Sequence, residues 1–381
     1  MTISNKLFAQ MRAATRSLFR RGPSVARSVI KESIRNASAL RPGAGKAMPY
    51  DRFNAASNQA SKDPFSDMLA GLNRIGQPGG NPFDVPPLTG GVGAPGLPGH
   101  VLEGSHSNAA GTRHYKLYVP STYTGAAPPG QPSALLVMLH GCSQNPDDFA
   151  LGTGMNALAE ECNCLVVYPA QSKGANPSRC WNWFNAVDQK HGQGEPSIIA
   201  GITEDVMARY VIDPGQVYVA GLSAGGAMAA IMGTLYPELY AAVGVHSGLP
   251  FAAAHDLPSA VAAMKGDFRR PKNPARGIPI IVFHGDRDTT VHPANGDELV
   301  HRRRRQPQSA VEVEIEPGQV PQGHAYTRTL HRRADGSIDA EHWVVHGSGH
   351  AWSGGDARGT YTDGKGPSAS RAMMRFFRTA R

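Results

Sequence analysis

Cysteine, long apolar runs and charged side chains are all scarce in this sequence. Its four cysteines (Cys142, Cys162, Cys164 and Cys180) are too few for a disulfide-dense scaffold and lack the spacing of a zinc finger. No stretch approaches the roughly 18 apolar residues that a membrane-spanning helix needs, so we expect no transmembrane segment. Because 40% of the residues are hydrophobic and only 18% are charged, composition also excludes a disordered protein.

Acidic residues are almost absent from the first fifty positions, which contain Glu32 alone beside ten Lys and Arg residues. The remaining 28 basic and 29 acidic residues nearly balance, so the net charge of +8 belongs to the N-terminal segment. Leu7, Met11, Ala14 and Leu18 recur at helical spacing, which predicts an amphipathic basic helix. We interpret it as a peripheral anchor for a membrane or polymer granule, an export leader or a solvated extension. It lacks the apolar core of a conventional signal peptide.

Glycine and proline are concentrated in residues 76–99, which contain eight Gly and six Pro. Such a segment loses too much conformational entropy on ordering to pack, and predicts an extended linker. We therefore expect a basic amphipathic extension over 1–75, a linker over 76–100 and one large domain over 101–381.

Apolar runs alternate with helical patterns after the linker. We predict strands over 114–119, 135–140, 165–169, 217–221, 242–246, 278–284 and 342–346, and helices over 147–161, 198–210, 224–235, 294–305 and 371–379. Short, continuously apolar runs such as LLVML and IPIIVF are typical of strands covered on both faces. The fold class is therefore α/β, with a mostly parallel central sheet flanked by helices and preceded by the basic helical extension.

The pattern Gly-Leu-Ser-Ala-Gly at 221–225 lies between a predicted strand and a predicted helix. A tight strand-to-helix turn would present Ser223 as a nucleophile, and a side chain at Gly221 or Gly225 would collide with a neighbouring segment. A serine hydroxyl needs a base to take its proton and an acid to orient that base.

The acid and the base are expected in loops that follow later strands. After the strand over 278–284, Asp286 and Asp288 both qualify, and we favour Asp288 because it lies further into the turn. After the last predicted strand, His350 follows a Gly-rich loop, so it is the candidate base. His140, His246, His284 and His346 are interpreted as structural.

Two backbone N–H groups are needed to stabilise the oxyanion of a tetrahedral intermediate. We assign these to Ala224, directly after the nucleophile, and to Cys142 in the loop after an early strand. Pairing Cys142 with Cys180 would clamp this loop to the aromatic run Cys180-Trp-Asn-Trp-Phe184, closing a loop of about 38 residues at about 3 to 4 kcal/mol. That run is either a core cluster or a substrate wall, and Trp181, Trp183 and Trp352 are the wall candidates.

With these motifs in order, residues 100–381 resemble the poly(3-hydroxybutyrate) depolymerase family of esterases within the α/β-hydrolase fold. The resemblance lies in LHGCSQN at 139–145, VVYP at 166–169, CWNWF at 180–184, GLSAGGAM at 221–228, FHGDRDTTV at 283–291 and GSGHAWSGG at 347–355. It implies a triad of Ser223, Asp288 and His350, with Cys142 at the oxyanion hole.

The resemblance implies hydrolysis of short-chain polyhydroxyalkanoate esters, or alternatively of feruloyl or acetyl esters of plant polysaccharide. We expect a monomeric serine esterase that uses no metal or organic cofactor and binds no nucleic acid. Its partners would be a polyester or small ester substrate and, through the N-terminal segment, a membrane or granule surface. Family membership implies an extracellular location, with a periplasmic or granule-associated one as the alternative.

Overall fold

A computed structural model describes residues 96–125, 132–268, 277–304 and 312–379, with only the backbone of 303 and 304. The predicted extension over 1–75 and most of the predicted linker over 76–100 lie outside the described residues. Within the described ranges, no helix is both long enough and apolar enough to cross a membrane.

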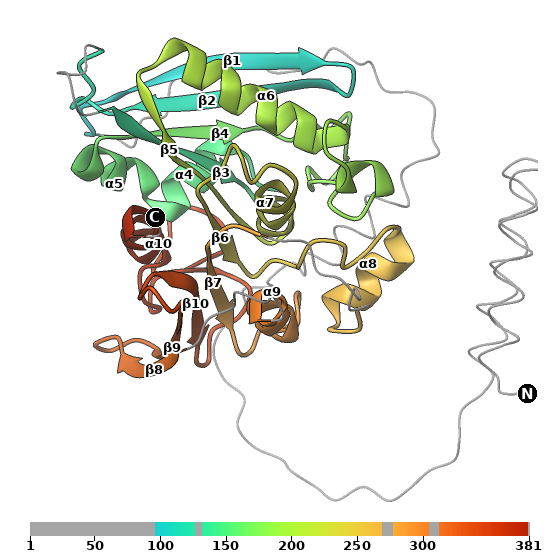
Figure 1. Ribbon diagram of the computed structural model, residues 1–381, viewed down its shortest axis with the longest axis vertical. Coiled ribbons are helices and arrows are strands. Elements are labelled where there is room, and N and C mark those ends of the chain that lie inside the picture. Colours follow the sequence, from blue (N-terminus) through green and yellow to red (C-terminus); the bar gives the residue numbers. More distant parts are fainter. Residues whose placement is uncertain (1–95, 126–131, 269–276, 305–311, 380–381) are drawn as a thin grey trace, which may run out of the picture. The chain divides into compact units, whose positions relative to one another are not determined.

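A ten-stranded sheet runs through the described part of the chain in the order β1-β2-β4-β3-β5-β6-β7-β10-β9-β8 (Figure 1). Its strands are β1 His100–Asn108, β2 Gly111–Val119, β3 Ser133–Leu139, β4 Cys164–Pro169, β5 Ile212–Leu222, β6 Ala242–His246, β7 Ile280–Gly285, β8 Glu312–Gln319, β9 Ala325–Arg332 and β10 Ile338–Val345. The six central strands, β4, β3, β5, β6, β7 and β10, pair in parallel. Strands β1 and β2 at one edge, and β9 and β8 at the other, join antiparallel. The predicted mostly parallel sheet is confirmed.

Helices cover both faces of this sheet (Figure 1). They are α4 Pro146–Thr153, α5 Met155–Cys162, α6 Gly194–Arg209, α7 Ala224–Leu235, α8 Leu257–Met264, α9 Ala294–Arg304 and α10 Ala369–Thr379, with a 3₁₀ turn η1 at Ala186–Gln189. A small two-stranded sheet pairs β11 Trp352–Ser353 with β12 Thr362–Asp363. The single helix predicted over 147–161 is wrong, because Gly154 adopts a left-handed conformation (φ 61°) that ends α4 and starts α5.

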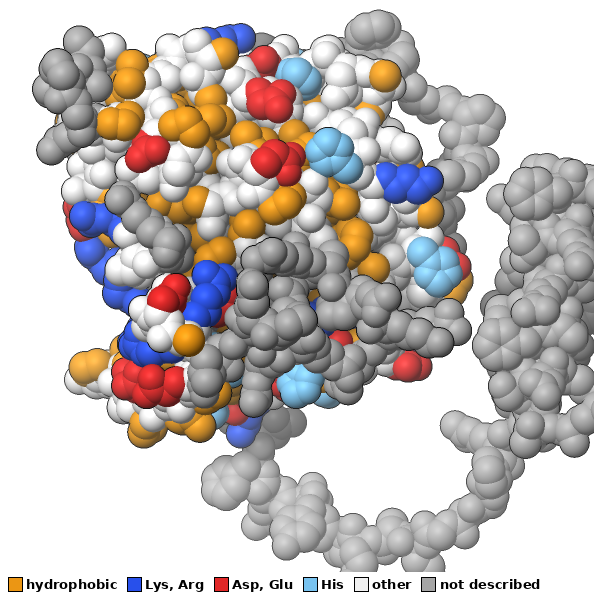
Figure 2. Space-filling view, in the orientation of Figure 1, with side chains coloured by type: hydrophobic (Ala, Val, Ile, Leu, Met, Phe, Trp, Pro, Cys, Tyr) orange, Lys and Arg blue, Asp and Glu red, His pale blue; other side chains and the backbone are white. Residues whose placement is uncertain are grey.

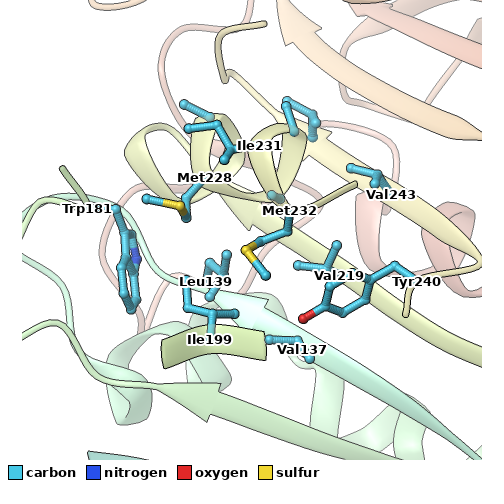
Figure 3. Packing of buried hydrophobic residues seen from close by; sticks show 14 of the residues in the cluster. Val137, Leu139, Trp181, Ile199, Val219, Met228, Ile231, Met232, Tyr240 and Val243 are labelled. Atoms are coloured by element: carbon cyan, nitrogen blue, oxygen red, sulfur yellow. The ribbon is translucent and has the colours of Figure 1, made fainter. Parts of the chain in front are cut away.

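Residue alternation on the central strands divides the core into two layers. On β3, Leu135, Val137 and Leu139 face the cluster that contains α6 and α7, whereas Leu136 and Met138 face the cluster that contains α5 and α10. Figure 3 shows the first cluster, in which Met228 and Met232 of α7 pack onto the sheet. Both layers are closely packed, which makes the sheet a rigid platform for the loops at its carboxyl edge.

Three strands of the large sheet (β1, β8 and β9) and helix α8 were not predicted from the sequence. Strand β1 and strand β8 are largely exposed, and the apolar side chains of β8 (Val313 and Ile315) point to solvent rather than to the core. The face drawn in Figure 2 carries acidic, basic and apolar side chains intermingled. No single sign of charge dominates that face.

Candidate active site

Ser223 stands at the sharp turn between β5 and α7. Its backbone angles, φ 58° and ψ −119°, lie in the left-handed half of the map that residues with a side chain rarely enter. The Ser223 N–H donates to the carbonyl oxygen of His246 at 2.9 Å, which ties the turn to the end of β6. A strained strand-to-helix turn of this kind presents a serine at the carboxyl edge of a parallel sheet.

Two glycines allow this turn because three backbone segments meet there. A β-carbon on Gly221 would overlap the backbone of Gly225, and one on Gly225 would overlap the carbonyl oxygen of Leu139 at the end of β3. A β-carbon on Gly141 would lie 3.6 Å from that of Ser223, so the loop after β3 borders the nucleophile. The predicted collision of a side chain at Gly221 or Gly225 is confirmed.

We expect Gly225→Ala to lower the free energy of unfolding by at least about 2 kcal/mol, the usual scale of overpacking. The backbone of β3 cannot yield to the added methyl group, and this outweighs the ~1 kcal/mol that alanine gains over glycine in a helix. Urea denaturation followed by circular dichroism measures the change. Gly174→Ala is the control: its nearest neighbour would be 4.0 Å away, so we expect a change within about 0.5 kcal/mol. Equal stability of the two variants would contradict this account.

Asp288 and His350 form a direct pair. His350 Nδ1 lies 2.7 Å from Asp288 Oδ2, while Asp288 Oδ1 accepts from the N–H groups of Thr290 (2.9 Å) and Val291 (2.8 Å). Burial alone would raise the pKa of Asp288, but hydrogen bonds from His284 and His350 outweigh it and hold that pKa well below its usual range. The ionised carboxylate therefore favours a proton on Nδ1 of His350 and leaves Nε2 free to accept one.

Asp286, the competing carboxylate, contacts a different histidine. It is exposed, lies 3.0 Å from Nδ1 of His346 and accepts from the N–H of Gly347 at 2.7 Å. Asp288, by contrast, has a side chain with no exposed surface and points at His350. The two carboxylates thus differ both in the histidine that they contact and in burial.

His246 links the nucleophile turn to the loop that carries His350. Its carbonyl oxygen accepts from Ser223 N–H, and its Nε2 accepts from the N–H of Ser353 at 2.9 Å. Burial lowers the pKa of His246 to about 3, so the ring stays uncharged and available as an acceptor. No hydrogen bond joins the hydroxyl of Ser223 to His350 among the residues that the structure describes; such bonds often form only when substrate is bound.

Two backbone amides, one directly after Ser223 and one in the bordering loop after β3, lack hydrogen-bond partners within the described ranges. They are the N–H groups of Cys142 and of Ala224, the first residue of α7. Cys142 is bonded to Cys180 by a disulfide across 38 residues, and buried His140 accepts from the N–H of Gln171 at 3.1 Å. Both contacts restrain the loop that presents the Cys142 amide.

The aromatic residues named as candidates for a substrate wall are packed in the two cores. Trp181 and Trp352 are 0% and 1% exposed, and Trp183 is 5% exposed. Trp181 donates to the carbonyl oxygen of His140, and Trp352 packs against Phe149 and His246. This burial argues against a substrate wall, because the indole rings fill space between loops and sheet and offer no open face.

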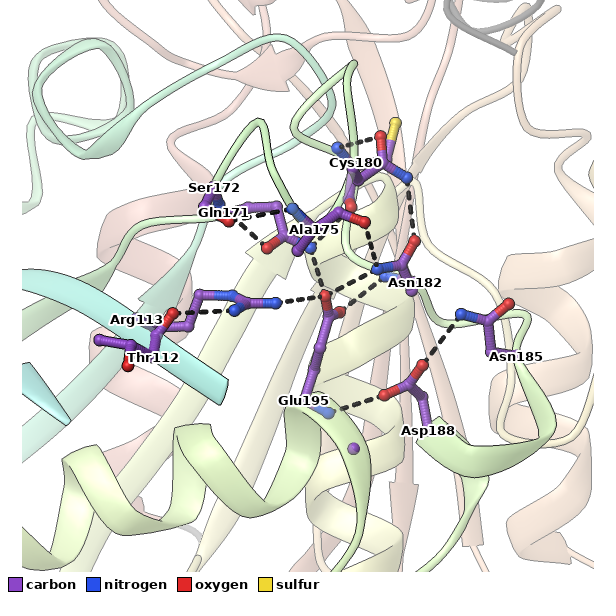
Figure 4. A network of polar contacts seen from close by, with 12 residues as sticks. Thr112, Arg113, Gln171, Ser172, Ala175, Cys180, Asn182, Asn185, Asp188 and Glu195 are labelled. Atoms are coloured by element: carbon purple, nitrogen blue, oxygen red, sulfur yellow. Dashed lines mark hydrogen bonds and ion pairs between the residues drawn. The ribbon is translucent and has the colours of Figure 1, made fainter. Parts of the chain in front are cut away.

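A buried polar network beside this loop was missed by sequence reasoning (Figure 4). Glu195 near the start of α6 pairs with Arg113 of β2, 3.0 Å between Oε1 and Nη2, although the two are 82 residues apart. Asp188 accepts from the N–H of Glu195 at 2.7 Å, and burial together with the charge of Glu195 raises the pKa of Asp188 to about 6. In the sequence this position shows only as Gly194-Glu195, a pair that carries no signal of burial.

The arrangement suits acyl transfer. A strained serine, a carboxylate–imidazole pair and two unpartnered amides lie in the loops and turns that follow β3, β5, β7 and β10. Among the described residues, no group of three or more His, Cys, Asp or Glu side chains could hold a metal ion.

Comparison with known proteins finds a family and relatives that are named as esterases or depolymerases. Residues 113–307 match the family described as Esterase PHB depolymerase. Poly(3-hydroxyalkanoate) depolymerase C of Paucimonas lemoignei is 32% identical over 61% of this chain and 57% of its own length, and feruloyl esterase B of Neurospora crassa is 28% identical over 42% and 60%. The chain thus spans little more than half the length of these relatives. An acetyl xylan esterase structure from Aspergillus awamori shares the fold, with a TM-score of 0.56 and 20% identity over 74% of this chain and all of that one.

Proposed function

The chain belongs to the Esterase PHB depolymerase family, and on that premise we propose that it is a serine esterase acting on short-chain polyhydroxyalkanoate or related hydroxyacyl esters. The observation that carries the proposal is the Asp288–His350 pair at 2.7 Å, on the same sheet edge as the strained Ser223. The esterase domain would span 101–381.

In the proposed mechanism, Nε2 of His350 takes the proton of the Ser223 hydroxyl as Oγ bonds to the ester carbonyl carbon. The carbonyl oxygen becomes an oxyanion that the amides of Cys142 and Ala224 stabilise. The intermediate collapses, the C–O bond breaks and the leaving alcohol takes the proton from His350. Water then attacks the acyl-enzyme with His350 again as base, releasing the acid and restoring Ser223. Every proton moves between Ser223, His350, substrate and water, so no cofactor enters the proposal.

A polyhydroxyalkanoate substrate is supported by the depolymerase of Paucimonas lemoignei, whose 32% identity to this chain exceeds the 28% of the feruloyl esterase. The alternative substrate is an acetylated or feruloylated plant polysaccharide. Acetylxylan esterase A of Talaromyces purpureogenus is 28% identical over 51% of this chain, so the alternative has its own support. The mixed charge of the face drawn in Figure 2 fits either substrate, since both are neutral and need no steering field.

We further propose that the protein acts outside the cytoplasm as a monomer and that its basic N-terminal segment attaches it to a membrane or polymer granule. The Cys142–Cys180 disulfide supports an oxidising compartment. The attachment rests on the charge and periodicity of residues 1–50, which lie outside the described residues.

A substrate panel tests the proposed function. With the purified full chain, we expect kcat/KM for hydroxybutyrate oligomers to exceed that for methyl ferulate and for acetylated xylan by at least about 10-fold, the scale on which an acyl pocket discriminates. A reversed order would favour the polysaccharide-ester alternative. Failure to hydrolyse any of the three would overturn the esterase proposal.

A further inference from the structure

We propose that Glu195 is a positioning residue for the oxyanion-stabilising amide of Cys142. It would act by fixing the segment 171–182, which in turn holds the loop after β3. This inference rests on the proposed esterase function, because it assigns a role in stabilising the same oxyanion.

Glu195 gathers donors from three parts of the chain (Figure 4). Its carboxylate is 5% exposed and accepts from Asn182 through the backbone N–H (2.7 Å) and Nδ2 (2.8 Å). It also accepts from Nε2 of Gln171 and from Arg113. The backbone of Glu195 is also held, because its N–H, at the start of α6, donates to the carboxylate of Asp188 in η1. It therefore joins the rigid α6 and β2 to the irregular segment 171–182.

Segment 171–182 is bonded at four points to the loop after β3 that contains Cys142, here called the oxyanion loop. The N–H of Gln171 donates to His140 Nε2 (3.1 Å), and Trp181 Nε1 donates to the carbonyl oxygen of His140 (3.1 Å). The Cys142–Cys180 disulfide and a 2.7 Å hydrogen bond from Ser143 N–H to the carbonyl of Ser178 complete the set. The side chain of Gln171 contacts both Glu195 and the carbonyl oxygen of Cys180, the latter at 2.8 Å. On the loop, each of the four points is Cys142 itself or lies within two residues of it.

A cavity of about 550 Å³ borders this network and is lined by Arg113, Asn182, Asp188 and Glu195, among others. Arg113 and Asn182 each donate from the side chain to the carboxylate of Glu195, and Asp188 accepts from the backbone N–H of Glu195. Ala175 and Asn182 of segment 171–182 also line this space, so we expect the segment to have room to shift once Glu195 releases it. The carboxylate is thus a restraint on a segment that otherwise has room to move.

A displaced Cys142 amide would weaken the transition state more than the bound ester, since the full negative charge on oxygen exists only in the tetrahedral species. Loss of one oxyanion donor in other hydrolases costs about 10²- to 10³-fold in kcat. A shifted donor should still supply part of the stabilisation of the oxyanion. We therefore expect a change at Glu195 to lower kcat by about 10- to 100-fold.

The experiment compares Glu195→Gln with Glu341→Gln in the full chain. Glutamine keeps the shape but places an NH₂ group against the donors of Asn182 and Gln171. Glu341 is an equally buried hub, binding Arg328 (3.0 Å) and Trp343 (2.6 Å) on β9 and β10, and has no contact with the oxyanion loop among the described residues. Readouts are kcat and KM for p-nitrophenyl butyrate, the inhibition constant of butaneboronic acid, which forms a tetrahedral adduct on serine, and thermal unfolding.

We expect both variants to lose similar thermal stability, but only Glu195→Gln to lower kcat about 10- to 100-fold at a KM within about 3-fold of wild type. The inhibition constant of the boronic acid should rise by a similar factor. An unchanged kcat, a change confined to KM, or an equal fall in kcat for Glu341→Gln would overturn the inference. If Glu195→Gln does not fold, Asn182→Ala decides. It removes the Nδ2 donor to Glu195 from a half-buried residue of segment 171–182 and keeps the backbone N–H donor, so we expect a smaller fall in kcat in the same direction. An unchanged kcat in this variant would also overturn the inference. An inactive wild type would refute the esterase function instead.

Discussion

Ser223→Ala should lower kcat for p-nitrophenyl butyrate by at least about 10⁴-fold while leaving the protein folded. Alanine removes the atom that would bond to the substrate carbonyl, and the remaining amides and imidazole can assist only direct attack by water. Because the Ser223 hydroxyl makes no hydrogen bond among the described contacts, its loss leaves no buried polar group unpaired.

Steady-state kinetics and circular dichroism together check this expectation. Ser133→Ala is the matched control, since Ser133 is a buried serine (4% exposed) at the opposite end of β3. We expect its kcat to stay within about 3-fold of wild type, as for a substitution remote from the site. Near-normal turnover by Ser223→Ala would remove this serine from the mechanism, whatever the fold.

Asp288→Asn should lower kcat by about 10⁴-fold, the size of the effect that the same change has on the buried triad aspartate of a serine protease. The new amide would donate toward Nδ1 of His350, force the ring proton onto Nε2 and leave no lone pair there for the Ser223 proton. The bonds from Thr290 and Val291 can still form to the amide oxygen, so the loop should keep its shape.

Asp286→Asn is the natural control because its carboxylate binds His346 and Gly347 instead. We expect its kcat within about 3-fold of wild type, measured on the same ester. If kcat falls strongly in Asp286→Asn and not in Asp288→Asn, the acid of the triad has been assigned to the wrong carboxylate.

The pH dependence of stability provides an independent readout of Asp288. Because its folded-state pKa is lowered, its contribution to stability is present above the unfolded pKa of about 3.9 and lost as the pH falls through the folded value. The stability difference between wild type and Asp288→Asn should therefore be largest near neutral pH and narrow below about pH 4, as followed by urea denaturation.

The sequence predicts the buried centre of the fold better than its margins. Strand β6 and helix α7 have the predicted bounds, because buried apolar runs and a Gly-rich turn define them. Strands β1 and β8 were missed because their side chains are mostly exposed, so no core imposes an apolar pattern on them. They are held by backbone pairing with β2 and β9, which leaves no compositional trace.

The same division holds for the candidate site. Ser223, Asp288 and His350 were named because each follows a buried strand in a fixed order, and the structure brings the last two into contact. The pairing of Arg113 with Glu195 could not be read from the chain, since it joins residues 82 apart through tertiary packing. Conversely, the tryptophans that suggested a wall are large side chains that the two cores need, and composition alone does not distinguish these uses.

The crowding of backbone around Gly221 and Gly225 also determines where this scaffold could be redesigned for other substrates. A variant library that randomises either glycine would consist mainly of destabilised members, because even a methyl group overlaps main-chain atoms there. A methyl group on Gly349 would meet no atom within 4 Å, although this glycine directly precedes His350. Diversity placed at Gly349 would therefore change the surroundings of His350 while leaving the turn that presents the nucleophile untouched.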